Sequence, residues 1–179
     1  LGLPGVALAG LTLLLQTKRR RARADATYRY WQTGLISGTL ALIMLAVAAI
    51  FPAAGELPGW TLFFGILLVV GGFLPLIIGM LYKIVPFLGW LHLQNCGQAK
   101  VPAPAMNKIL ADPAMQRQMK AHVAALLLLL AAVLAPDWLA RPAGLALALP
   151  GAWLGWNLFG ATRRYRQFRS DILARLATP

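Results

Sequence analysis

The chain has 179 residues, of which 59% are hydrophobic and only 12% are charged. A water-soluble domain carries about 25% charged residues, so this composition excludes a single soluble core. The charge is strongly basic, with 17 lysines and arginines against 5 acidic residues and a formal net charge of +12. Such an excess is typical of proteins that contact nucleic acid or an anionic membrane surface.

Five apolar stretches predict membrane-spanning helices, because a span needs about 20 mostly apolar residues to cross ~30 Å of hydrocarbon. None of them alternates with a period of two, which excludes the strands of a membrane barrel. We therefore expect an all-α, polytopic transmembrane helix bundle in residues 1–162, followed by a tail in residues 163–179. The expected spans are residues 1–17, 31–52, 58–83 with an extension to 93, 121–135 and 142–162.

The cations lie in alternate connections between these stretches. Six separate the first span from the second, four separate the third from the fourth, and five follow the fifth, whereas the other two connections hold none and one. The positive-inside rule places the cation-rich connections in the cytoplasm, with the N-terminus outside and the C-terminus inside. A nucleic-acid binder would instead gather its cations on one folded surface, so we expect no nucleic-acid partner.

The start of the chain and its composition bear on its origin. Leu1 lies inside an apolar stretch with no basic segment before it, which is not the pattern of an intact signal peptide. We interpret the chain as a piece of a longer protein. The abundance of alanine, leucine and arginine points to a bacterial protein, so we expect it in the bacterial inner membrane. The single cysteine, Cys96, excludes an internal disulfide framework and a cysteine-built metal cluster.

The tail after the fifth span has an amphipathic pattern. Apolar residues recur there at steps of three and four, and the opposite face is rich in arginine. We predict a basic amphipathic helix that lies on the inner leaflet; the alternative is a fifth helix that continues into water. The apolar positions are Tyr165, Phe168, Ile172 and Leu176, and the membrane-surface arginines are Arg163, Arg164, Arg166 and Arg169.

Small residues predict where helices pack closely, because glycine lets two backbones approach where lipid supplies no hydrophobic drive. Two GxxxG motifs occur, one in the second span and one in the fifth, and a third set of glycines recurs every seven residues in the third span. The expected packing positions are Gly34, Gly38, Gly65, Gly72, Gly79, Gly151 and Gly155.

The third apolar stretch is the longest and carries most of the candidate chemistry. Residues 58–93 would extend ~54 Å as one helix, so this segment must tilt, kink at Pro75 or Pro86, or emerge from the hydrocarbon. Lys83 lies about 12 Å along the axis from the centre of the run, and the hydrocarbon boundary lies about 15 Å from the midplane. Its ammonium group can therefore reach the head groups, or it faces the bundle interior and meets a ligand or another subunit.

Two histidines, His92 and His122, both fall by this measure at the cytoplasmic face of consecutive helices. Two such imidazoles are what a bis-histidine haem or a quinone pocket requires, and ordinary interfacial histidines are the alternative. Met115 and Met119 share a helical face with His122, and we interpret this face as packing surface rather than as Met/His ligands of haem or copper. The pattern identifies no particular metal. Asp112 and Pro113 predict that the fourth helix begins near Pro113.

The sequence GMLYKIVPFL at residues 79–88, followed by Trp90 and His92, resembles a signature near the C-terminal end of some bacterial polytopic membrane proteins related to the catalytic subunit of haem–copper oxidases. The resemblance implies that this chain is the last five helices of a larger membrane protein, or a shortened relative that serves as a subunit of a respiratory complex. The paired histidines that the family carries between its two haems have no counterpart here, so no metal-ligand role is implied for any residue.

Two functions of different class follow. The first is an integral membrane subunit associated with a haem-type electron-transfer complex, with Tyr82, Lys83, Trp90, His92 and His122 close to a haem or quinone. The second is a non-catalytic structural or assembly subunit of a membrane complex. A transporter is a third class, but the spans lack charge pairs and a clear repeat. We expect no catalysis by this chain alone, because no acidic residue lies in a span and no phosphate loop or catalytic triad occurs.

Overall fold

The computed structural model describes residues 26–98 and 100–177, and within these ranges every regular element is a helix. The first expected span, residues 1–17, lies outside the described residues. Three helical segments are long and apolar enough to cross a membrane: Thr27–Ile50, Trp60–Cys96 and Asp112–Leu134. The all-helical class and the apolar, membrane-length helices are therefore as predicted, whereas the number of spans and their orientation stay predictions.

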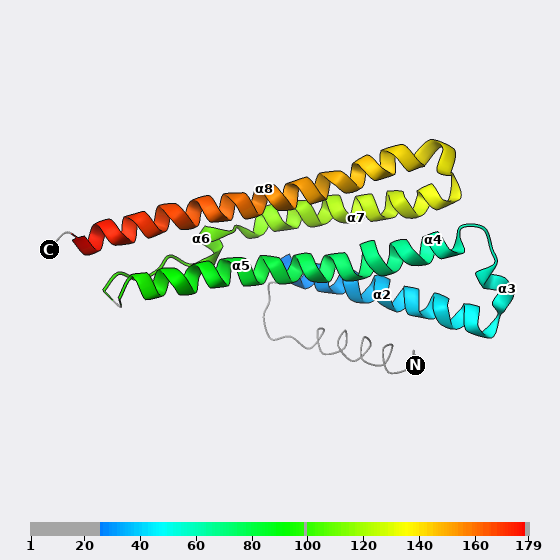
Figure 1. The fold of residues 1–179 in the computed structure, drawn as a ribbon, viewed down its shortest axis with the longest axis horizontal. Coiled ribbons are helices and arrows are strands. Elements are labelled where there is room, and N and C mark those ends of the chain that lie inside the picture. Colours follow the sequence, from blue (N-terminus) through cyan, green and yellow to red (C-terminus); the bar gives the residue numbers. More distant parts are fainter. Residues whose placement is uncertain (1–25, 99, 178–179) are drawn as a thin grey trace.

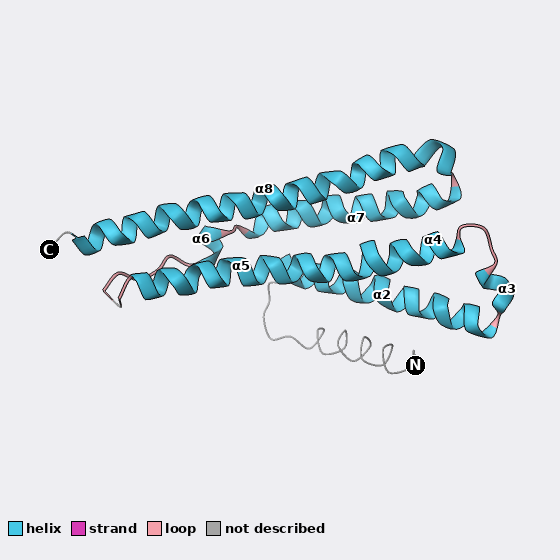
Figure 2. Ribbon diagram, in the orientation of Figure 1, coloured by secondary structure: helices cyan, strands magenta, loops and turns pink. Residues whose placement is uncertain are grey.

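Four long rods form the bundle (Figures 1 and 2). The first is α2, the second is the consecutive series α4, η1 and α5, and the third and fourth are α7 and α8. Helices α2 and α7 run in one direction, and the other two rods run in the opposite direction, so α5 and α8 are parallel neighbours. The bounds are α2 Ala26–Ile50, α3 Pro52–Gly55, α4 Trp60–Gly65, η1 Ile66–Phe73, α5 Leu74–Cys96, α6 Met106–Ile109, α7 Asp112–Leu134 and α8 Pro136–Ala177.

The second rod changes its hydrogen-bond register at η1, a π-helix of 8 residues. The N–H of Leu74 donates to the Val69 carbonyl, five residues back, instead of the usual four. Pro75 follows directly, and its ring excludes the α-helical position of the carbonyl four residues earlier. The expected irregularity at Pro75 is thus present as a widened turn, whereas Pro86 lies buried inside the regular part of α5.

Glycines bring α2 and the second rod into close contact. A Cβ added at Gly34 would lie 2.7 Å from Leu76 Cγ, and one at Gly79 would lie 3.0 Å from Tyr30 Cβ. One at Gly72 would lie 3.6 Å from the Cα of Gly38. These four predicted packing glycines therefore lie at the interface of the two helices.

Three other predicted packing glycines make no such contact. A Cβ added at Gly65, Gly151 or Gly155 would meet no atom within 4 Å among the described residues. Gly151 and Gly155 are exposed on α8, which presents other residues to α7. A packed contact for these three glycines therefore stays a prediction, because the GxxxG spacing creates a flat face without determining which neighbour covers it.

Helix α8 is a single uninterrupted helix of 42 residues, about 63 Å long. Helix α8 therefore has no break at residue 162, whereas contact of residues 163–177 with the inner leaflet or with water stays a prediction. Its apolar face is covered by protein: Ile172 is buried, and Phe168 packs in one cluster with Leu93, Val101 and Ile109. An amphipathic pattern identifies an apolar face but does not distinguish lipid from protein as its cover.

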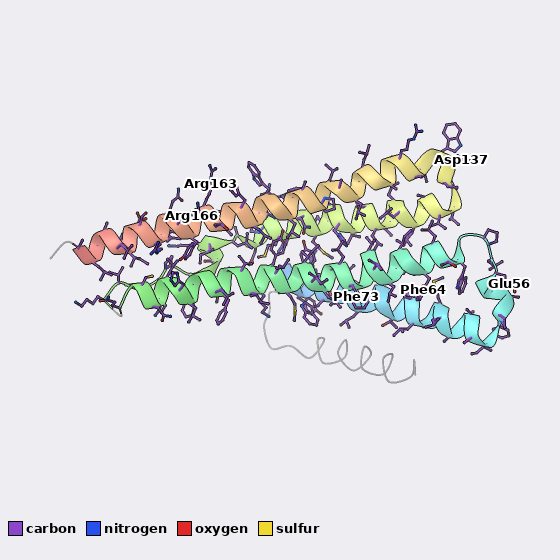
Figure 3. All side chains as sticks on the ribbon, in the orientation of Figure 1. Glu56, Phe64, Phe73, Asp137, Arg163 and Arg166 are labelled. Atoms are coloured by element: carbon purple, nitrogen blue, oxygen red, sulfur yellow. The ribbon has the colours of Figure 1, made fainter. Side chains whose placement is uncertain are left out.

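The outer faces of the rods are apolar, and the two ends of the bundle differ in charge. Leu127, Leu145 and Trp156 expose 61%, 72% and 72% of their surface. Exposed apolar surface of this extent is suited to contact with lipid. Figure 3 shows Glu56 and Asp137 at one end of the bundle, whereas the arginines of the α8 tail lie toward the other.

Candidate functional site

Seven polar side chains are buried among the described residues. The five that are larger than Thr27 and Ser37 we call the buried polar set: Tyr30, Tyr82, Gln118, His122 and Asn157. They come from α2, α5, α7 and α8, and none exposes more than 7% of its surface. Polar groups inside a membrane bundle are costly unless they are hydrogen-bonded, and they commonly mark functional positions. The set is therefore the first candidate site.

Two tyrosines and an asparagine join all four long rods. The Tyr30 hydroxyl donates to the Met115 carbonyl of α7 at 3.2 Å. The Asn157 side chain of α8 donates from Nδ2 to the Tyr82 hydroxyl oxygen at 2.8 Å. The two tyrosine rings meet edge to face, with centroids 5.7 Å apart. These contacts fix the positions of α2, α5, α7 and α8 relative to one another along the bundle axis.

Gln118 and His122 lie one turn apart on α7 and face the interior. Gln118 donates from Nε2 to the Pro150 carbonyl of α8 at 3.0 Å. His122 Nε2 lies 3.0 Å from the Val70 carbonyl of η1. A carbonyl oxygen only accepts, so Nε2 carries the proton in this contact and Nδ1 is the free acceptor of the neutral ring.

The partner of His122 is a carbonyl that the helix leaves without a backbone donor. In an α-helix the N–H of Leu74 would bond to Val70, but here it bonds to Val69. In the wider π register the next donor to the Val70 carbonyl would be residue 75, a proline without an N–H. His122 supplies the missing donor and so compensates for the irregularity that Pro75 causes.

Two acceptors of the buried polar set have no hydrogen-bond partner among the described residues. They are Gln118 Oε1 and His122 Nδ1, each on a side chain with no exposed surface. Both belong to side chains whose other polar atom is already bonded to a carbonyl of another helix. The donor groups of these residues are thus used to connect helices.

A second, more open group lies where α5 and α8 continue side by side beyond the polar set. The Nδ1 atom of His92 is hydrogen-bonded to the Tyr165 hydroxyl, and His92 Nε2 lies 3.9 Å from the Cys96 sulfur. Arg164 donates from Nη1 to the Ile109 carbonyl at 2.9 Å, which attaches α6 to α8. A groove of about 270 Å³ adjoins these residues and is lined by Val85, Leu88, Gly89, His92, Ile109, Ala161, Thr162 and Tyr165.

The structure does not bring the two histidines together. His122 contacts Val70, and the helical segment from Val70 to His92 extends about 33 Å. The expectation that both imidazoles lie at one face of the membrane is therefore wrong, because His122, in the middle of α7, packs against η1 in the first half of the second rod. One haem cannot be ligated by both residues in this arrangement.

The remaining predicted cofactor residues are also dispersed. Tyr82 belongs to the buried polar set, whereas Lys83 points outward and is exposed. The outward position favours head-group contact over contact with the bundle interior. Trp90 is half-buried and lies against Phe87, with ring centroids 6.3 Å apart. Met115 and Met119 are buried in the apolar core, which supports packing as their role.

Three members of the buried polar set were not predicted as site residues: Tyr30, Gln118 and Asn157. One signal pointed to Asn157, since an amide in an otherwise apolar stretch needs an internal partner. Gln118 carried a weaker signal, because it lies on the same face as Met115 and His122. Tyr30 precedes the apolar run and resembles an ordinary interfacial tyrosine.

Comparison with known proteins adds no identity to this geometry: no family model, no curated protein and no solved structure matches the chain. The resemblance to haem–copper oxidase relatives therefore stays a prediction from residues 79–92. The candidate site must be interpreted from its own contacts.

Proposed function

We propose that this chain is a membrane-embedded helical scaffold, a non-catalytic structural or assembly subunit of a larger membrane protein complex. One observation carries the proposal: each side chain of the buried polar set forms a hydrogen bond to a rod other than the one that carries it. The contacts are Tyr30 to α7, Asn157 to α5, Gln118 to α8 and His122 to η1. The donor groups of these side chains are thereby used to fix the relative positions of the helices.

The proposed setting is the bacterial inner membrane, with five spans, the N-terminus outside and the C-terminus in the cytoplasm. The difference in charge between the two ends of the bundle supports this orientation. The acidic residues Glu56 and Asp137 lie at one end, and the basic part of α8 lies toward the other (Figure 3). Residues 1–17 and the apolar part of α8 would supply the two spans beyond the three apolar segments.

A second candidate is association with electron transfer, and the groove beside His92 favours a quinone over a haem. Both ring nitrogens of His92 already face Tyr165 and Cys96, so neither is directed into an open site for iron. A quinone needs donors for its carbonyl oxygens and an apolar wall for its ring. The hydroxyl of Tyr165, which keeps its hydrogen for a ligand when it accepts from His92 Nδ1, and the side chains of Val85 and Leu88 provide these features in a groove of about 270 Å³.

A visible absorption spectrum and a quinone extraction of the full chain, purified in mild detergent, separate these candidates. The scaffold proposal predicts no Soret band and no stoichiometric quinone. It also predicts that a His92→Ala variant keeps its thermal midpoint, whereas His122→Ala loses stability. A Soret band that either histidine variant abolishes overturns the scaffold proposal. One quinone per chain that is lost in Tyr165→Phe and retained in the control Tyr28→Phe, which lies outside this groove, establishes the second candidate instead.

A further inference from the structure

A groove of about 700 Å³ lies on the outside of the bundle, between α2 and α7. Its volume falls within the range of about 300–1,000 Å³ that is usual for small-molecule sites. The groove is distinct from the buried polar set, whose side chains face the interior. None of the predicted cofactor residues lines it.

The groove has a polar end and an apolar end, and each of the two helices contributes a cation to the first and an apolar residue to the second. Arg29 on α2 and Lys120 on α7 line the polar end, and both side chains are exposed. Ile36 and Leu127 line the apolar end and expose 50% and 61% of their surface. Because α2 and α7 run in the same direction, each helix places its apolar residue about 10 Å further along the same direction (Figure 1).

The polar end also holds neutral hydrogen-bonding groups. Gln32 donates from Nε2 to the Tyr28 hydroxyl oxygen at 2.9 Å, and Thr33 lies in the same wall. None of the acidic residues that the structure describes lines the groove. The two cations therefore give this end a positive charge that no described carboxylate in the groove offsets.

We propose that this groove binds an anionic phospholipid of the surrounding bilayer. The phosphate lies between Arg29 and Lys120, and an acyl chain follows Ile36 and Leu127 toward the middle of the membrane. Basic pockets between membrane helices on the cytoplasmic side are suited to anionic head groups, since each nearby cation adds to the attraction. A lipid bound in this way connects α2 to α7 and strengthens the contact between the two halves of the bundle. The proposal does not depend on the scaffold role of the polar set.

Native mass spectrometry of the full chain in detergent tests this binding. We expect one phosphatidylglycerol to bind more tightly than phosphatidylcholine with the same acyl chains. The double variant Arg29→Gln/Lys120→Gln should bind phosphatidylglycerol about 30-fold more weakly, because two head-group cations are removed. Ile36→Trp keeps both cations but fills the apolar end, so it should weaken the binding of both lipids; unchanged binding of both lipids would overturn the proposed path of the acyl chain.

A matched control removes two cations elsewhere. Lys100→Gln/Lys108→Gln lowers the net charge by the same amount at exposed positions outside the groove, and it should leave the dissociation constant within twofold of the parent. Equal weakening by the two double variants overturns the proposal, because general surface attraction then explains the binding. Binding that is insensitive to Arg29→Gln/Lys120→Gln overturns it as well, and residues 1–25 or a second copy of the chain then become the candidates for the groove.

Discussion

The middle of the bundle and its basic end each contain one histidine, and the two side chains are used differently. In the middle, His122 has no exposed surface and donates to the Val70 carbonyl of another rod. At the basic end, His92 is exposed and shares a hydrogen bond with Tyr165 beside an open groove. The contrast shows that residue type alone does not define a site in this chain.

The difference follows from the positions of the two histidines along the rods. In the middle, four rods surround each polar group, so a donor without a partner would remain in an apolar environment. At the basic end α5 and α8 contact each other through His92 and Tyr165 and also through the short α6, where Arg164 bonds to Ile109. Polar contacts therefore hold the structure together in the middle, whereas the basic end contains an open groove beside its polar contacts.

The largest expected effect comes from overpacking the middle. A Cβ at Gly71 would lie 2.7 Å from Ser37 Cβ, so Gly71→Leu must push α2 away from η1. We expect a loss of about 3 kcal/mol in the free energy of unfolding. Gly151→Leu is the matched control, because its Cβ meets no described atom within 4 Å. Denaturant titration of both variants in detergent measures the effect, and equal losses would contradict the close contact.

The second prediction compares the two histidines directly. His122→Leu leaves the Val70 carbonyl without a donor and should cost about 2 kcal/mol, since an unpaired buried polar group costs about 1–3 kcal/mol. His92→Leu removes an exposed side chain and should change stability by less than about 0.5 kcal/mol. Unfolding of both variants in detergent is the measurement. If His92→Leu is the more damaging of the two, the basic end is held by its polar contacts after all.

The third prediction concerns how the basic end is covered. Ile172 exposes 4% of its surface and packs against the end of α5 and the region of α6. Ile172→Ala should destabilise this end by about 1.5 kcal/mol, the value of an apolar side chain removed from water or lipid head groups. Hydrogen exchange of residues 163–177 should become faster, while exchange in α7 is unchanged. The exposed neighbour Leu173 provides the control Leu173→Ala; unchanged protection in Ile172→Ala would mean that lipid covers this face instead.

The glycine motifs illustrate the limits of sequence reasoning in this chain. Both GxxxG motifs were predicted to pack, and the pair Gly34 and Gly38 lies against the second rod, whereas Gly151 and Gly155 are open. Gly71, which contacts Ser37, was not predicted, because it falls outside the seven-residue series. The π register of η1 shifts which residues face α2, and periodicity counted from an ideal helix cannot account for that shift.

Composition and hydropathy were enough to predict an all-helical protein with apolar segments of membrane length, since the cost of an unpaired backbone in lipid leaves few alternatives. The sequence also showed that the cations lie in alternate connections and that the tail carries an apolar stripe. The contacts made by each face depended on how the rods pack: α8 covers its stripe with α5 and α6, and His122 meets η1 instead of His92. These pairings join residues far apart in the chain, and the periodicity of a single helix holds no information about its partner.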